Sequence, residues 1–168
     1  MSQYPLIADH GLIGNLQTAA LVSTDGTIDW FCAPRFDSPS IFGCLLDQDR
    51  GGHLRTRPTV DTFTRQQLYY PDTAILVTRF LTESGVGEVA DFMPIASTTV
   101  ASDRHQLVRM IRCVRGEMTF AVDIAPRFDY GRESHETHIF EDGVLFEGAR
   151  NAMSLNLIRE GTSNNVWR

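Results

Sequence analysis

The sequence predicts an all-β fold, an antiparallel β-sandwich with at most one short helix. Two observations lead to this prediction. Turn signals recur at short intervals, among them Asp25-Gly26, Gly51-Gly52, Gly116-Glu117 and Asp142-Gly143. Between these turns apolar and polar residues alternate with a period close to two, whereas long helical periodicity is scarce. Many short strands at hairpin spacing are typical of an antiparallel sandwich or barrel.

The first element expected along the chain is a hairpin whose turn is Asp25-Gly26. Residues 20–22 form one of its strands and residues 28–31 the other, with Trp30 expected in the core. The segment after Pro39, within residues 38–48 (SPSIFGCLLDQ), is the one stretch that predicts a helix, and a short one.

Later segments predict further strands. Residues 73–82 (TAILVTRFLT) and 106–114 (QLVRMIRCV) are partly apolar on both faces, as in central strands covered on two sides. Residues 118–124 (MTFAVDI) and 152–158 (AMSLNLI) alternate cleanly, as in strands with one buried face. The glycines of residues 84–89 (SGVGEV) lie between two strands, where we expect a hairpin turn.

The composition indicates one globular domain that spans residues 1–168. The formal net charge is -6, and the 15 basic residues are all arginines scattered along the chain, which argues against a nucleic-acid surface. The N-terminus lacks a basic region followed by an apolar run, and no stretch approaches the roughly 20 apolar residues of a membrane span. We therefore expect a cytoplasmic protein that binds neither nucleic acid nor membrane.

The cysteines and histidines do not predict a metal site. Cys32, Cys44 and Cys113 are odd in number and lie among apolar neighbours, so we expect reduced core thiols. His135 and His138 are three residues apart, which in a strand places them on opposite faces. The sequence has no nucleophile elbow, phosphate loop or strand-led dinucleotide fingerprint. We expect no metal and no cofactor.

Several aspartates lie beside aromatic residues. Asp29, Asp37, Asp91 and Asp129 occur in the contexts IDWF, RFDS, ADFM and RFDY. A carboxylate beside a ring suits a sugar-binding surface, because the ring stacks on C–H groups and the carboxylate accepts hydroxyl protons. The same residues also suit strand ends and turns, where an aspartate caps local N–H groups. Periodicity favours the second interpretation.

The tetrapeptide Pro-Arg-Phe-Asp occurs twice, at residues 34–37 and 126–129. Each copy follows a predicted strand, and its proline ends regular pairing. Each is either a structural corner, with the arginine and aspartate paired locally, or a surface for another domain or a substrate. The candidate interface residues are Trp30, Arg35, Phe36, Asp37, Arg127, Phe128, Asp129 and Tyr130.

Residues 7–47, from IADHGLIG through STDGTIDWFCAPRFDSPSIFG to CLLD, closely resemble the opening of bacterial trehalase-like and glucoamylase-like proteins of glycoside hydrolase family 15. The resemblance continues through YYPDTAILVTRFLTESGVGEVADFMP, LVRMIRCVRGEMTFAVDIAPRFDYGR and FEDGVLFEGA, and so covers residues 7–157. It implies a supersandwich-like N-terminal β-sandwich, which we expect this chain to leave incomplete. In that family an α/α toroid follows the sandwich and supplies two glutamates for an inverting reaction. We expect that toroid to be absent from the chain, so no catalytic residue is transferred.

The resemblance implies a non-catalytic domain that supports or borders the catalytic toroid of its parent. The parent is expected to hydrolyse an α-glucoside, above all trehalose, and to contact carbohydrate itself. Two alternatives stay open. The chain could be a free-standing carbohydrate-binding module that stacks sugars on Trp30, Phe36, Phe128 and Tyr130. It could also be an assembly module that forms a homo-oligomer, because uncovered strand edges and apolar surface invite pairing.

Overall fold

The computed structural model describes residues 4–95, 97, 99–100 and 103–158. The chain forms two compact units, Met1–Arg132 and Glu133–Arg168, which we describe separately. The elements of the first unit are η1 (Ile7–Asp9), β1 (His10–Gly14), β2 (Ala19–Ser23), β3 (Thr27–Cys32), β4 (Ser40–Phe42), β5 (His53–Pro58), β6 (Thr64–Tyr69), β7 (Leu76–Leu81), β8 (Gly85–Phe92), β9 (Val108–Gly116), β10 (Phe120–Ala125) and α1 (Phe128–Gly131). The elements of the second unit are β11 (His135–Ile139), β12 (Gly143–Gly148) and β13 (Ala152–Asn156).

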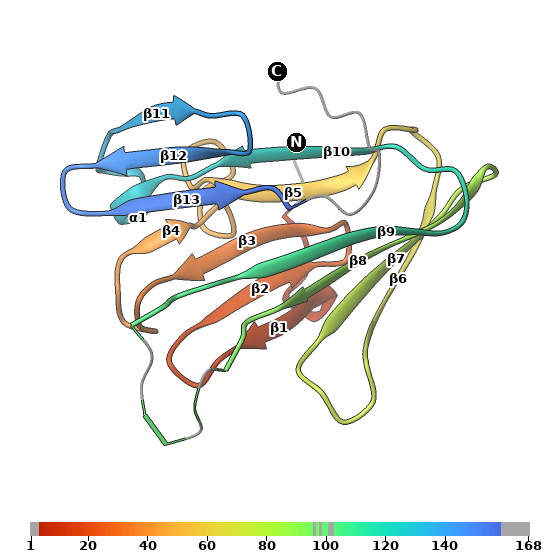
Figure 1. Ribbon diagram of the computed structural model, residues 1–168, viewed down its shortest axis with the longest axis horizontal. Helices are drawn as coiled ribbons and strands as arrows, with labels where there is room; N and C mark the ends of the chain where they lie inside the picture. The colour runs from red at the N-terminus through yellow and green to blue at the C-terminus, as the bar shows by residue number, and fades with distance from the viewer. Residues whose placement is uncertain (1–3, 96, 98, 101–102, 159–168) are drawn as a thin grey trace. The chain divides into compact units, whose positions relative to one another are not determined.

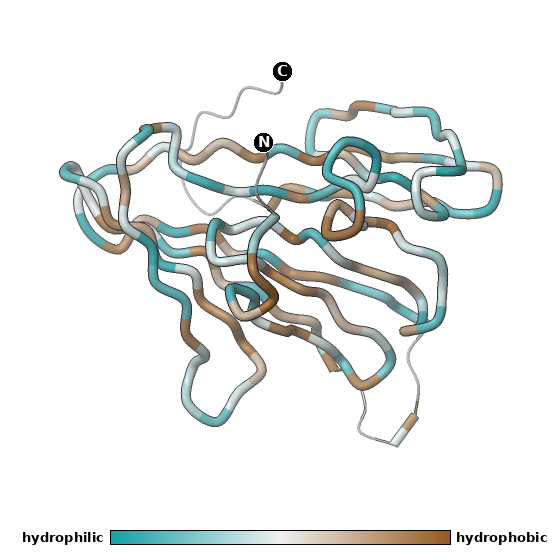
Figure 2. The backbone as a smooth tube through the Cα atoms, turned by 180° about the vertical axis from the view of Figure 1, so that it is seen from behind, coloured by the Kyte–Doolittle hydropathy of each residue, from teal (hydrophilic) through white to brown (hydrophobic). Residues whose placement is uncertain are grey.

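The first unit contains two antiparallel sheets (Figure 1). One has the order β1-β2-β3-β5-β10, with β4 paired to β3, and the other has the order β6-β7-β8-β9. Along the strands of both sheets apolar stretches alternate with polar ones (Figure 2). The predicted all-β antiparallel fold is confirmed.

The two sheets of the first unit pack face to face. Phe80 of β7 meets Phe120 of β10 edge-on, with ring centroids 6.0 Å apart. Gly11 of β1 lies so close to Leu76 of β7 that a Cβ at that position would collide with it. The core residues that are less than 2% exposed include Ile13, Val22, Ile28, Leu76, Val77, Phe80 and Val89. Burial of such side chains stabilises each by about 1.5–3 kcal/mol.

A buried ion pair also joins the two sheets. Arg109 of β9 binds both carboxylate oxygens of Asp91 of β8, at 2.7 and 3.0 Å. Its Nη1 donates to the carbonyl of Gly26, in the turn between β2 and β3, and to the Leu54 carbonyl and the Thr56 hydroxyl of β5 in the opposite sheet. The side chains of Arg109 and Asp91 are 7% and 0% exposed. Because both carboxylate oxygens of Asp91 and all three guanidinium nitrogens of Arg109 are bonded, the charges are tolerated inside the core.

The predicted helix within residues 38–48 is wrong. Residues 40–42 form β4 instead, and the backbone beyond it is held by longer-range bonds: Gly43 donates to the carbonyl of Gly51, and Leu45 to that of Asp29. The local bonds of this segment, from the N–H groups of Leu46 and Asp47 to the Gly43 carbonyl, form a turn that does not continue into a helix. The helical segments described in this unit are the short η1 and α1, which spans Phe128–Gly131.

The turn predicted at residues 84–89 lies earlier. Thr82 donates to the carbonyl of Gly85, and β8 begins at Gly85. Gly87 therefore lies inside a strand, where a Cβ would run into the ring of Phe120. Glycine at this position permits the close approach of β10.

Two of the three cysteines are core thiols, as predicted. Cys32 and Cys44 are free and buried, and burial raises the pKa of Cys44 to about 11. The prediction was wrong for Cys113, which is exposed on β9. A strand that is partly apolar on both faces is expected to be covered on two sides, but β9 lies at the edge of its sheet.

The second unit is a three-stranded antiparallel sheet in the order β11-β12-β13. His135 stacks edge-on against Phe146, whereas His138 lies beside Glu136 and Glu147. The two histidines thus face opposite sides of β11, as predicted. Across the residues that the structure describes, no helix is long and apolar enough to cross a membrane.

Candidate functional site

A β-bulge in β3 sets up the first part of the site. Leu21 of β2 pairs with Trp30 and Val22 pairs with Ile28, so Asp29 has no partner in β2. A bulge of this kind re-aims the neighbouring side chains. Asp29 bonds to His10, which points away from the second sheet because the adjacent Gly11 faces that sheet. The bulge therefore places Asp29 on the outer face of the first sheet.

His10 and Asp29 form a buried pair there. His10 Nε2 lies 2.7 Å from Asp29 Oδ2, and the two side chains are 1% and 4% exposed. His10 Nδ1 lies 2.8 Å from the carbonyl of Leu6, which can only accept, so this nitrogen carries a proton. One further proton lies between Nε2 and Oδ2. The pair thus retains one proton more than a neutral imidazole beside a carboxylate would hold.

The pKa values agree with this proton count. Burial by itself lowers the pKa of His10, but the hydrogen bond and charge of Asp29 and the carbonyl groups of Leu6 and Ile7 outweigh it, so the pKa is raised. Burial raises the pKa of Asp29 and outweighs the opposing effects of His10. Asp29 Oδ1 is buried without a hydrogen-bond partner among the described residues.

The second part of the site is a left-handed turn after β10. Asp129, Tyr130 and Gly131 have φ angles of 51°, 58° and 76°, so α1 is not a regular right-handed helix. The left-handed conformation costs about 1–2 kcal/mol for each non-glycine residue. Phe128, which is fully buried, and the bond from Arg127 N–H to the Ile41 carbonyl hold the turn against β4.

This turn displays Tyr130 beside Trp30. The ring centroids are 6.3 Å apart and the planes are tilted by 43°. The guanidinium of Arg132 lies 5.5 Å from the centre of the Tyr130 ring and donates to Asp129 Oδ1 at 2.7 Å. The result is an aromatic pair with a cation over one ring and a carboxylate beside it.

The loop between β3 and β4 forms a separate exposed tip. Arg35 donates from Nε and Nη2 to the two carboxylate oxygens of Asp37, at 3.0 and 3.2 Å. These side chains are 71% and 73% exposed, and Phe36 between them is also exposed. Ser38 closes the loop, because its hydroxyl accepts from Arg35 N–H and its own N–H donates to the Arg35 carbonyl.

The structure thus divides the eight candidate residues. It brings Trp30, Asp129 and Tyr130 together and leaves Arg35, Phe36 and Asp37 on the tip, while both groups flank β4. Phe128 is core, and Arg127 Nη1 donates to the carbonyl of the adjacent Pro126. The expectation that Trp30 belongs to the core is wrong, since its side chain is only half-buried on the outer face.

Sequence reasoning missed Arg132 and His10. Arg132 follows Asp129 by three residues, a spacing that favours an ion pair, but the left-handed turn that stacks it on Tyr130 has no local signal apart from Gly131. The bond between His10 and Asp29 depends on strand register and on a bulge, which the local pattern does not show.

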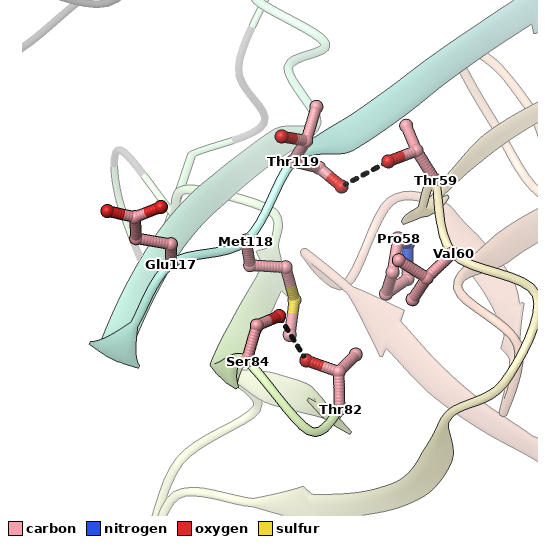
Figure 3. Close-up of a pocket in the computed structure, with 8 residues that line it drawn as sticks. All are labelled: Pro58, Thr59, Val60, Thr82, Ser84, Glu117, Met118 and Thr119. Atoms are coloured by element: carbon pink, nitrogen blue, oxygen red, sulfur yellow. Dashed lines mark hydrogen bonds between the residues drawn. The ribbon is translucent and has the colours of Figure 1, made fainter.

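A small hollow lies away from this site, where three turns of the first unit meet (Figure 3). Its volume is about 190 Å³, below the roughly 300–1,000 Å³ of ordinary small-molecule sites. Its hydroxyl groups bond within the turns: Thr59 donates to the Thr119 carbonyl, and Thr82 lies 3.1 Å from Ser84. The lining residues are Pro58, Thr59, Val60, Thr82, Ser84, Glu117, Met118 and Thr119. We assign no ligand to it.

Known proteins that resemble the chain identify its family. The family described as "Trehalase-like, N-terminal" matches residues 2–165. The chain belongs to this family. Similar proteins include Trehalase 1 of Sulfolobus acidocaldarius, 35% identical over 93% of this chain, and the trehalase of Mycolicibacterium smegmatis, 34% identical over 78% of it. The trehalase of Thermoplasma volcanium is 30% identical over 91% of the chain.

The matched region is a small part of each relative. It covers 26% of the Sulfolobus protein, 22% of the Mycolicibacterium protein and 25% of the Thermoplasma protein. This trehalase-like N-terminal domain therefore spans about a quarter of the relatives that it matches. No solved structure matches the chain.

The exposed tip gives a first testable prediction. Arg35→Ala is expected to change the free energy of unfolding of this chain by only about 0–1 kcal/mol, because an exposed ion pair is screened by water. Urea unfolding of Arg35→Ala, Asp37→Ala and the double variant measures both the losses and their coupling. A loss of several kcal/mol for Arg35→Ala would identify the tip as a structural corner.

Proposed function

We propose that this chain is the non-catalytic N-terminal domain of a longer family 15 glycoside hydrolase that cleaves an α-glucoside with inversion, and that trehalose is the substrate. The observation that carries the proposal is the match of residues 2–165 to a family described as N-terminal, together with the similarity to about a quarter of the length of proteins named trehalase. In the proposed parent, an α/α toroid after this domain supplies the two glutamates, one as general acid and one to activate water.

The chemistry of the buried acids supports a non-catalytic role. Glycosidases need two carboxyl groups that face each other across an open site, roughly 5–10 Å apart. The buried acids of the described residues are instead engaged by cations of the fold: Asp29 by His10, Asp91 by Arg109, and Glu88 by both Arg79 and Arg112. Burial by itself raises the pKa of Glu88, but hydrogen bonds from Arg112 and Arg79 outweigh it and lower that pKa. Such an acid stays ionised and is unsuited to donate a proton.

We further propose that the end of the sandwich around β4 borders the catalytic part. Loops on a rigid sheet are common places for binding residues. Here the tip presents Phe36 between two charges, and the left-handed turn presents Tyr130 with Trp30 and Arg132. Backbone strain at Asp129 and Tyr130 supports this assignment, because strained conformations cluster at functional sites.

The exposed Tyr130 ring beside a carboxylate also favours a second candidate function, direct binding of carbohydrate by this domain. Calorimetric titration of the chain with trehalose and with maltose separates the two. Heat of binding that disappears in Tyr130→Ala but persists in Tyr69→Ala, a second exposed tyrosine, would support a binding module. Absence of binding supports a domain that acts only within its parent.

We predict that the chain by itself does not hydrolyse trehalose, maltose or starch. The reason is that, among the described residues, the buried Asp29 and Asp91 are held in ion pairs, and the carboxylates of the candidate site, Asp37 and Asp129, are bonded to Arg35 and Arg132. Release of glucose by the purified chain is the measurement, with Sulfolobus Trehalase 1 as the positive control. Turnover that survives purification and is lost in Asp37→Asn or Asp129→Asn would contradict the prediction.

A further inference from the structure

One side of the sandwich of the first unit is formed by the edge strands β9 and β10 and is open. β9 is the last strand of the four-stranded sheet, and β10 is the last strand of the other sheet. The two strands are joined by the short turn at residues 117–119, and they are the uppermost strands of their sheets in Figure 1. A Cβ at Gly87, in the strand next to β9, would touch Phe120 of β10, so the two layers are in contact there. Both sheets therefore end on the same side.

Inward-facing apolar residues are exposed on this side. Ile111 of β9 pairs with Val89, which is fully buried, and so points into the sandwich, yet it is 39% exposed. Val122 of β10 pairs with Thr56, also fully buried, yet it is 44% exposed. In a closed sandwich such residues would be covered on all sides. Here the interior itself reaches the surface between β9 and β10.

The edge has little of the protection that edge strands usually carry. β9 is nine residues long and contains neither proline nor lysine, and Met110 and Val114 are exposed on it as well. Its charge is largely neutralised within its own sheet, since Arg109 binds Asp91 and Arg112 binds Glu88. Among the described residues, Arg115 is the arginine of β9 that has no ionic partner.

We propose that this open side binds a second copy of the same chain, so that β9 pairs antiparallel with β9 of the other copy and β10 with its counterpart. The two-layered shape of the edge selects this partner. A single added strand would pair with β9 but leave Val122 of β10 uncovered. A second copy, related by a two-fold axis perpendicular to the sheets, presents two matching strands and extends both layers at once. The dimer is independent of the proposed function, since it uses neither the tip nor the left-handed turn.

The charges of β9 favour one register. With the two-fold axis at Ile111, each Ile111 lies opposite its copy, Val108 lies opposite Val114, and Met110 lies opposite Arg112. No arginine then faces another arginine, whereas an axis at Arg112 would oppose two of them directly. In the preferred register the two Cys113 residues are separated by about 13 Å along the strands, at about 3.3 Å for each residue.

The first test is the mass of this chain in solution across a range of concentrations, measured by sedimentation. We expect a dimer that dissociates on dilution. Ile111→Lys is expected to weaken the dimer by about tenfold or more, because it buries a charge at the axis. Ile139→Lys is the matched control, since Ile139 is an exposed isoleucine on a strand of the second unit. A monomer at every concentration, or equal weakening by both variants, would overturn the proposal.

A second measurement does not depend on the folding of Ile111→Lys. A spin label added to the unaltered chain will react at Cys113, because Cys32 and Cys44 are buried. We expect a short distance between two labels that disappears when labelled chains are diluted with excess unlabelled chain. If the chain is dimeric but the labels show no such contact, another surface joins the copies and the β9 interface is wrong. Absence of sugar hydrolysis or sugar binding has no bearing on either result.

Discussion

Arg109→Met is expected to lower the free energy of unfolding of this domain by about 3–5 kcal/mol, because it leaves a buried carboxylate without its cation. Asp91 is fully buried and receives two bonds from Arg109, which also donates to two groups of β5 and to the β2–β3 turn. Methionine retains much of the volume of the side chain, so the loss measures the charge and the hydrogen bonds more than a cavity. Urea unfolding followed by far-ultraviolet circular dichroism gives the value.

Two further variants show whether the ion pair causes this loss. Arg112→Met is the matched control on the same strand: Arg112 is largely exposed, and Glu88 keeps its bond to Arg79, so a much smaller loss is expected. The double variant Arg109→Met/Asp91→Leu removes both charges and is expected to recover part of the stability, because a buried pair is often replaceable by apolar residues. Equal losses of unfolding free energy for Arg109→Met and Arg112→Met would show that the buried Arg109 contributes no more to stability than the exposed Arg112.

The strands that the sequence predicted well are those with local signals. The hairpin at Asp25-Gly26 and the strand within residues 118–124 follow from a turn dipeptide and from strict alternation. The order of the strands has no such local source. β5 lies between β3 and β10, a placement that depends on contacts between residues distant in the sequence. The helix expected within residues 38–48 failed for the same reason, since long-range bonds fix that backbone.

The candidate site shows the same division. The repeated Pro-Arg-Phe-Asp directed attention to two corners that both flank β4, and the pairing of Arg35 with Asp37 was anticipated as one interpretation. The sequence could not show that the second copy differs from the first. In that copy Phe128 is buried and Asp129 bonds to Arg132, because the backbone turns left-handed there. The hand of such a turn is decided by tertiary packing around it.

The His10–Asp29 pair predicts a pH dependence of stability. The pKa of His10 is raised in the folded domain, so the native state holds a proton that the unfolded chain releases near pH 6.5. Its contribution is therefore fully present below about pH 6.5 and is lost as the pH rises through the folded pKa. The raised pKa of Asp29 acts in the same direction, because the native pair holds on to protons more strongly than the unfolded chain does. We expect the melting temperature of the unaltered chain to fall as the pH rises above about 6.5.

His10→Gln tests this dependence directly. At pH 6 the variant is expected to lose about 3–5 kcal/mol, because glutamine cannot supply the charge that Asp29 needs in a buried position. Above pH 6.5 its melting temperature is expected to change less with pH than that of the unaltered chain, so the two curves approach each other. His53→Gln is the control, since His53 also bonds to an aspartate, Asp123, but that aspartate is largely exposed.

If the unaltered chain and His10→Gln show parallel curves, the shared proton does not stabilise the fold, and the raised pKa has no thermodynamic consequence. If they converge, the proton shared by His10 and Asp29 stabilises the fold, because it holds η1 and the start of β1 against the outer face of the sheet. Asp29 directly precedes Trp30, which contacts Tyr130, so the same proton supports the candidate site.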